Sequence, residues 1–138
     1  MDLGTFGAII KFALEIEGQV LELYTSLAEQ TKDGALKQLY EELVSRGQKR
    51  IKTLERVRRE NVTEMILEPI EGLDSDSFRI ETAVLARSED TVKTHVKNIE
   101  SILQSFYEAA ATKIDFLPEA AYAFELLAEK NEETIKRF

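Results

Sequence analysis

The sequence has no cysteine and no tryptophan, and it has one histidine and two prolines among its 138 residues. The absence of cysteine excludes disulfide bonds, thiolate zinc sites, iron–sulfur ligation and a cysteine nucleophile. The only strong metal ligands that remain are carboxylates and the imidazole of His95.

Long apolar runs and positive charge are also scarce. No apolar run reaches the about eighteen residues that a membrane span needs, and the start MDLGTFGAII has no basic region typical of a secretory signal. The chain has 18 Lys and Arg against 26 Asp and Glu, for a formal net charge of −8. We therefore expect a cytoplasmic protein without membrane contact, and the acidic balance argues against nucleic acid as the main partner.

The remaining composition is typical of a globular protein. Hydrophobic residues make up 43% of the chain and charged residues 32%, which is an ordinary balance for a soluble protein. A chain of this length buries roughly two-thirds of its unfolded surface, which is enough for one core. We expect a single domain over residues 1–138.

A thirteen-residue pattern appears twice, at residues 16–28 (IEGQVLELYTSLA) and at residues 99–111 (IESILQSFYEAAA). Each copy carries one glutamate, Glu17 or Glu100, on an otherwise apolar helical stripe. An isolated buried charge costs several kcal/mol, so each carboxylate must be paired, protonated or bound to a metal. The two stripes are Ile10, Ala13, Glu17, Val20, Leu21, Tyr24 and Leu27, and Val92, Val96, Glu100, Leu103, Tyr107 and Ala110.

Four helices follow from the periodicity. The pattern predicts a first helix over about residues 5–29 and a second over about residues 34–61. A turn at residues 31–34 joins them, and Asp33 is the expected N-cap of the second helix. The third helix starts somewhere between residues 77 and 88 and continues to about residue 112. The fourth begins at Pro118, which suits the first position of a helix. The second and fourth helices present Leu36, Leu39, Tyr40, Leu43, Gly47, Arg50, Ile51, Leu54 and Val57, and Ala120, Phe124, Leu127, Asn131, Thr134, Ile135 and Phe138 on one face.

The predicted fold is all-α: a ferritin-like antiparallel four-helix bundle made of two duplicated helical hairpins joined by a long crossover. The hairpins cover about residues 5–61 and 88–138, and the crossover covers about residues 62–87. A second repeat, of residues 39–52 with residues 123–136, supports the duplication, because its offset of 84 differs by one from the offset of 83 for the first repeat. The crossover contains Met65, Ile66, Leu67, Ile70 and Leu73, and we expect it to pack along the bundle.

These residues resemble the rubrerythrin-like members of the ferritin-like superfamily. The resemblance rests on A-L-E-I-E-x-x-x-x-x-x-Y-x-x-L-A at residues 13–28, on its echo I-E-x-x-x-x-x-x-Y at residues 99–107, and on the helix pattern of nearly the whole chain. It implies a di-iron site in the bundle core that serves peroxide reduction, oxygen chemistry or iron oxidation. Such a site takes one Glu from each of two helices and a Glu-x-x-His motif from each of the other two.

The ligand positions of that family are only half present. The single Glu ligands match Glu17 and Glu100. The first Glu-x-x-His motif falls on Gly47 and Arg50, and the second falls on the pair Asn131 and Thr134. Arg50 cannot be deprotonated, so it would repel a cation where the family has an imidazole. We therefore expect a degenerate di-iron site without a cofactor.

The alternative interpretation is an iron-binding oxidoreductase with an atypical site around Glu17 and Glu100. Rubrerythrins proper carry a cysteine-ligated iron domain, and this chain has no cysteine, so such an enzyme would need an external electron donor. The acids nearest the fourth helix's ligand positions lie off its apolar face, and we expect them to be solvated: Glu129, Glu132 and Glu133. His95 lies roughly 140° around its helix from Glu100, and we interpret it as a surface or half-buried residue.

A physical substitute for the metal is Arg50 itself. We expect its guanidinium group to bridge Glu17 and Glu100, with Gly47 making room for it. One cation against two carboxylates leaves a surplus negative charge, so one Glu should titrate high. The alternative is that Arg50 extends to solvent while both glutamates lie near the bundle rim. The remaining hydrogen bonds are expected from Tyr24, Tyr107, Asn131 and Thr134.

Seven bases and one acid occupy positions in the segment 46–59. This run is either an anion or nucleic-acid patch or, as is more usual, the solvated side of a helix neutralised by acidic neighbours.

The function that we favour from the sequence is a binding, assembly or structural role. We expect an unidentified protein partner and a homodimer that uses the apolar crossover as a surface.

Overall fold

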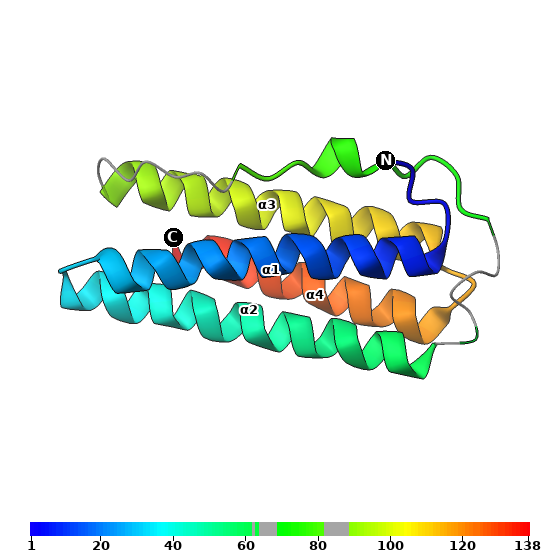
Figure 1. The fold of residues 1–138 in the computed structure, drawn as a ribbon, viewed down its shortest axis with the longest axis horizontal. Coiled ribbons are helices and arrows are strands. Elements are labelled where there is room, and N and C mark those ends of the chain that lie inside the picture. The colour runs from blue at the N-terminus through cyan, green and yellow to red at the C-terminus, as the bar shows by residue number, and fades with distance from the viewer. Residues whose placement is uncertain (62, 64–68, 82–88) are drawn as a thin grey trace.

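The structure is a computed structural model of residues 1–138, and it describes residues 1–61, 63, 69–81 and 89–138. These residues form an all-helical bundle in which the long helices lie side by side (Figure 1). No β-strand occurs among them; Asp2 and Asp74 form one isolated antiparallel bridge. The elements are α1 (Phe6–Gln30), α2 (Gly34–Glu60), the 3-10 helix η2 (Ser75–Phe78), α3 (Glu89–Lys113) and α4 (Pro118–Arg137).

The helix ends agree with the local sequence. Asp33 is the N-cap of α2, and its carboxylate accepts from the backbone N–H groups of Ala35 and Leu36 over 2.9 and 3.1 Å. Pro118 opens α4, where its missing N–H costs nothing. The predicted bounds of the first, second and fourth helices are confirmed to within a residue or two. The described part of α3 begins at Glu89, and residues 82–88 lie outside the described part of the chain.

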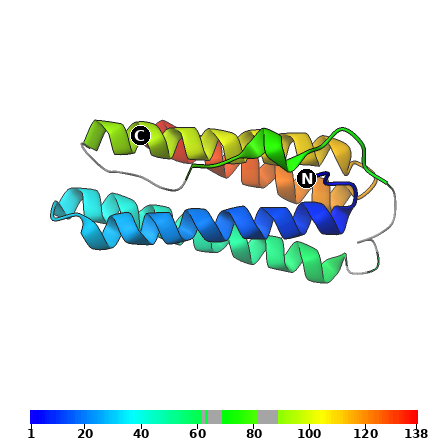
Figure 2. The same cartoon turned by 45° about the horizontal axis from the view of Figure 1, so that its top comes forward.

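The four helices pack in two antiparallel pairs, α1 with α2 and α3 with α4 (Figures 1 and 2). The views show that α2 and α3 run in the same direction, so the chain returns along the bundle between them. The described part of this connection lies beside α3, which η2 contacts. Ile70 and Leu73 are buried as predicted, whereas Met65, Ile66 and Leu67 lie outside the described residues.

The first four residues pair with this connection, which the sequence did not indicate. The backbone N–H of Leu3 donates to the carbonyl of Leu73 over 2.9 Å, and that of Ile70 donates to Gly4 over 2.8 Å. The side chain of Leu3 is fully buried. The N-terminus therefore holds the connection against one end of the bundle.

The core follows the predicted apolar faces of all four helices. Leu21, Leu36, Leu39 and Ile51 are only half-buried, and the other apolar members of the predicted faces on α1 and α3 are buried. None of the helices in the described ranges is long and apolar enough to cross a bilayer. Among the residues whose burial the structure describes, five polar or charged side chains are buried with the core: Glu17, Arg50, Glu100, Asn131 and Thr134.

Candidate functional site

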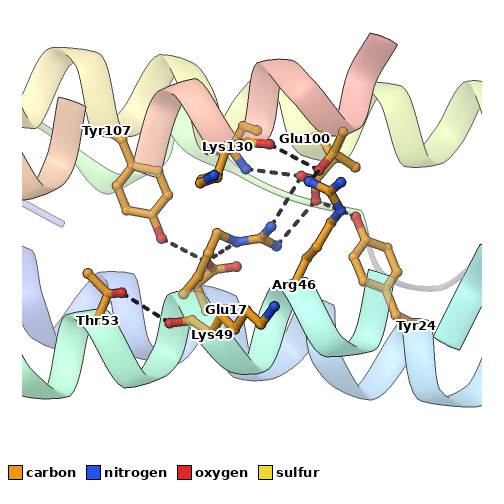
Figure 3. A network of polar contacts seen from close by, with 11 residues as sticks. Glu17, Tyr24, Arg46, Lys49, Thr53, Glu100, Tyr107 and Lys130 are labelled. Carbon is orange, nitrogen blue, oxygen red and sulfur yellow. Dashed lines mark hydrogen bonds and ion pairs between the residues drawn. The ribbon is translucent and has the colours of Figure 1, made fainter. Parts of the chain in front are cut away.

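A polar cluster occupies the middle of the bundle, and each of the long helices α1, α2, α3 and α4 contributes to it. Its members are Glu17 and Tyr24 from α1, Arg50 from α2, Glu100 and Tyr107 from α3, and Asn131 from α4; we call these six residues the Arg50 cluster (Figure 3). The helical period places these positions on the inward faces, so the same spacing that builds the core also brings the charges together.

Arg50 bridges the two buried glutamates. Its Nε donates to Oε2 of Glu17 over 2.6 Å, while Nη2 and Nη1 donate to Oε2 and Oε1 of Glu100 over 3.3 and 3.4 Å. Arg50 is 3% exposed and both glutamates are 0% exposed. The predicted bridge is therefore confirmed, and the alternative in which Arg50 extends to solvent is wrong.

The two tyrosines cross over between the helix pairs. The hydroxyl of Tyr24 donates to Oε2 of Glu100 over 2.6 Å, and the hydroxyl of Tyr107 donates to Oε2 of Glu17 over 2.9 Å. Each tyrosine thus serves the glutamate of the other repeat copy. Asn131 Nδ2 adds a donor to Glu100 over 3.0 Å, so the hydrogen bonds expected from Tyr24, Tyr107 and Asn131 are confirmed.

Thr134 does not join the Arg50 cluster, so this part of the prediction is wrong. Its hydroxyl donates to the carbonyl of Lys130 over 3.0 Å, as a threonine hydroxyl within a helix commonly does toward the residue four positions earlier. The same hydroxyl accepts from Nη1 of Arg46 over 3.4 Å. Thr134 therefore connects to Arg46, which sequence reasoning had not assigned to the site.

The two carboxylates have unequal surroundings. Glu100 accepts four hydrogen bonds, spread over both oxygens, from Arg50, Tyr24 and Asn131. Glu17 accepts two, both on Oε2. Within the described part of the chain, Oε1 of Glu17 and Oδ1 of Asn131 are buried without a hydrogen-bond partner. Glu100 is thus the more completely hydrogen-bonded of the two carboxylates.

Burial and the neighbouring charges shift the pKa values of several groups in the Arg50 cluster. Burial raises the pKa of Glu17 above its ordinary value, although the charge and hydrogen bond of Arg50 act in the opposite direction. Burial alone would lower the pKa of Arg50, but the charges of Glu17 and Glu100 outweigh it and raise that pKa well above its usual range. Burial and the nearby glutamate raise the pKa of Tyr24 and of Tyr107 far above normal. Arg50 is charged and both tyrosines are neutral donors.

Gly47 lies beside the guanidinium group, but the expectation that glycine is needed there to make room for it is not borne out. A Cβ atom at this position would lie 4.0 Å from Nη2 of Arg50 and 3.4 Å from Cδ1 of Leu21, which are ordinary contact distances. The space beside Arg50 therefore admits a methyl group, and the bridge does not depend on glycine at this position.

A di-iron group does not fit these residues. The guanidinium group of Arg50 contacts the carboxylates of both glutamates, and it cannot release its proton to become a ligand. In the described ranges no three side chains of the His, Cys, Asp and Glu types gather closely enough to hold a metal ion. Glu129, Glu132 and Glu133 are exposed, and half-buried His95 contacts the Glu81 carbonyl, with Nε2 at 2.6 Å.

The basic run on α2 is partly neutralised by acidic neighbours. Arg46 forms ion pairs with Glu42 at 3.3 Å and with Glu133 on α4 at 3.8 Å, and Arg56 pairs with Glu60 at 3.5 Å. Arg50 belongs to the core. The run is therefore not one continuous surface patch.

Comparisons with protein-family models, with curated proteins and with solved structures gave no match.

Proposed function

We propose that this chain is a rubrerythrin-like, ferritin-like bundle that has lost di-iron chemistry and serves a binding, assembly or structural role. The observation that carries the proposal is the 2.6 Å contact between Nε of Arg50 and Oε2 of Glu17, at the matching position of a family ligand. A permanent cation of the protein takes the place in which the family holds iron.

The crossed tyrosines support the family part of the proposal. Glu17 and Tyr24 are separated by the same seven positions as Glu100 and Tyr107, and the two hydroxyl–carboxylate bonds run reciprocally between α1 and α3. Two copies of one helical hairpin, facing each other, give this arrangement.

The loss of metal chemistry rests on charge. Iron at Glu17 and Glu100 would have to displace Arg50, which would leave a buried guanidinium group without its partners, or would have to bind beside it against its repulsion. Breaking a buried ion pair costs about 3–5 kcal/mol. The substituted positions Gly47 and Asn131 supply neither a carboxylate nor an imidazole to offset that cost.

The assembly role that we propose includes a homodimer, but its surface differs from the expected one. Ile70 and Leu73 of the crossover are buried in the chain's own core. Among the described residues, the large apolar side chains that remain exposed are Met1, Tyr122 and Leu126, and the last two lie one turn apart on α4. Sedimentation equilibrium of the wild-type chain and of Leu126→Glu measures whether copies pair through α4.

Metal analysis tests the central claim. We expect protein that is loaded with ferrous iron in air, and then desalted, to retain far less than one iron per chain, with no ultraviolet absorption from an oxo bridge. The matched variant is Glu17→Gln with Glu100→Gln, which removes both candidate ligands. Two irons per chain that disappear in this variant would establish the iron-binding oxidoreductase and overturn the proposal.

A further inference from the structure

A cavity of about 320 Å³ opens between α2 and α4, on the outer side of Arg50. Four of its nine lining residues are basic and two are acidic, and Figure 3 shows Lys49 extending from α2 and Lys130 from α4. The lining residues are Glu42, Ser45, Arg46, Lys49, Arg50, Thr53, Leu127, Lys130 and Glu133.

The charges around this cavity do not cancel. Glu42 pairs with both Arg46 and Arg137, at 3.3 and 2.7 Å. Glu133 pairs with both Arg46 and Lys130, at 3.8 and 3.5 Å. Two carboxylates are thus shared among three bases.

Lys49 adds a fourth base and has no ion-pair partner among the residues that the structure describes. Glu17 and Glu100 form ion pairs with Arg50 on its core side and neutralise its charge. The mouth of the cavity therefore carries surplus positive charge in a chain whose formal net charge is −8. Because the protein as a whole is acidic, this positive charge is a local feature of the cavity and does not reflect the overall composition.

The geometry of the wall suits a small ligand. Lys49 and Lys130 carry point charges on long side chains from opposite helices, and Leu127 supplies a buried apolar side. Arg46 adds a guanidinium group that Glu42 and Glu133 already contact. The volume lies at the lower end of the range for small-molecule sites, and it is far too small for a nucleic-acid duplex. Arg and Lys together are the side chains that proteins use for phosphate groups.

We propose that the cavity between α2 and α4 binds a small multivalent oxyanion of the phosphate class, held by Lys49 and Lys130 with Arg46 beside them. The site lies outside the Arg50 cluster, so the proposal does not depend on whether the core has lost iron chemistry. It gives the binding role a location and a ligand class.

Calorimetric titration of the full chain with inorganic pyrophosphate tests this. We expect saturable binding of one pyrophosphate per chain, weakened about tenfold by Lys49→Gln and by Lys130→Gln, because each removes one charge-assisted contact. The matched controls are Lys52→Gln on α2 and Lys136→Gln on α4, which remove exposed lysines that do not line the cavity. These should change the affinity less than twofold.

Two results of the titration would overturn the proposal. One is the absence of saturable binding at millimolar pyrophosphate, and the other is an equal loss of affinity in the control variants, which would indicate attraction to the general surface. Backbone amide shifts of the wild-type chain give a readout that needs no variant. They should change on pyrophosphate addition at Ser45, Lys49 and Lys130, and changes confined to other parts of the bundle would equally rule the site out.

Discussion

The Nε atom of Arg50 donates a hydrogen bond to Oε2 of Glu17 over 2.6 Å, with both side chains closed off from solvent. This edge of the guanidinium group faces α1, and its two terminal nitrogens face Glu100 on α3. One planar cation thus joins three helices. Because the fork has donors on more than one edge, arginine can do this and a point charge cannot.

Replacing Arg50 by Ala should lower the free energy of unfolding by about 3–5 kcal/mol, because it leaves two buried carboxylates without their cation. Urea denaturation followed by circular dichroism measures the loss. The matched control is Arg56→Ala on the same helix, which removes a 3.5 Å pair with Glu60 whose side chains are both 55% exposed. That change should cost less than about 1 kcal/mol. Equal effects of the two substitutions would contradict a buried bridge.

Arg50→Lys separates charge from shape. A lysine keeps the positive charge but has one ammonium group, which cannot contact Glu17 through one edge and Glu100 through another. We expect a loss of about 1–3 kcal/mol, because at least one buried hydrogen-bond acceptor is left without its donor. Full stability in urea denaturation would show that charge alone holds the cluster.

The pH dependence of the free energy of unfolding should report the protonation of Glu17. Burial raises its folded pKa above the ordinary value of 4.5, so the native state holds a proton that the unfolded state releases as the pH rises above that value. The free energy of unfolding therefore decreases as the pH rises from about 4.5 through the folded pKa, and the contribution of Glu17 is fully present only below this interval.

Glu17→Gln carries no titrating proton, so the stability of this variant should depend less on pH over the same interval. The measurement is a series of urea denaturations from pH 4 to pH 8, in steps of about half a pH unit. At each pH, the free energy of unfolding of the wild type is compared with that of the variant. Glu15→Gln, an exposed carboxylate on the same helix, is the control and should leave the slope unchanged. Parallel curves for the wild type and Glu17→Gln would show that Glu17 does not take up the proton.

Periodicity was sufficient to predict the helices and the bridge. The positions of Glu17, Arg50 and Glu100 on apolar helical faces place three charges in one core, and electrostatics then requires that they meet. Thr134 lies on such a face too, but the helix backbone satisfies its hydroxyl locally. Periodicity predicts which helix face a side chain lies on, but it does not predict which acceptor a hydroxyl group on that face will bind.

Two other features depend on contacts that no local pattern encodes. The pairing of Leu3 with Leu73 joins segments that are distant in the sequence and have no helical or strand periodicity. The cavity between α2 and α4 arises where Lys49 and Lys130 come into proximity across helices. The basic run at residues 46–59 was its only sequence signal, and the residue that completes it belongs to another helix.

Tyr24→Phe should lower stability by about 1.5–3 kcal/mol, because it removes a hydrogen bond of 2.6 Å to a buried carboxylate. Tyr107→Phe removes the 2.9 Å bond to Glu17, and we expect a similar loss. Tyr122→Phe is the control, since this tyrosine is 60% exposed. Urea denaturation of the three variants measures the difference, and equal stabilities would mean that the hydroxyl groups contribute nothing to the cluster.

Gly47→Ala should leave the stability unchanged or raise it by up to about 1 kcal/mol, because alanine favours the helix and its Cβ meets only ordinary contacts. Gly72→Ala provides the contrast. Gly72 has a φ of +80°, which an L side chain rarely adopts, so alanine there should cost about 1 kcal/mol or more. Thermal and urea unfolding of both variants measure this. A large loss in Gly47→Ala would mean that the guanidinium group of Arg50 needs the whole space beside it.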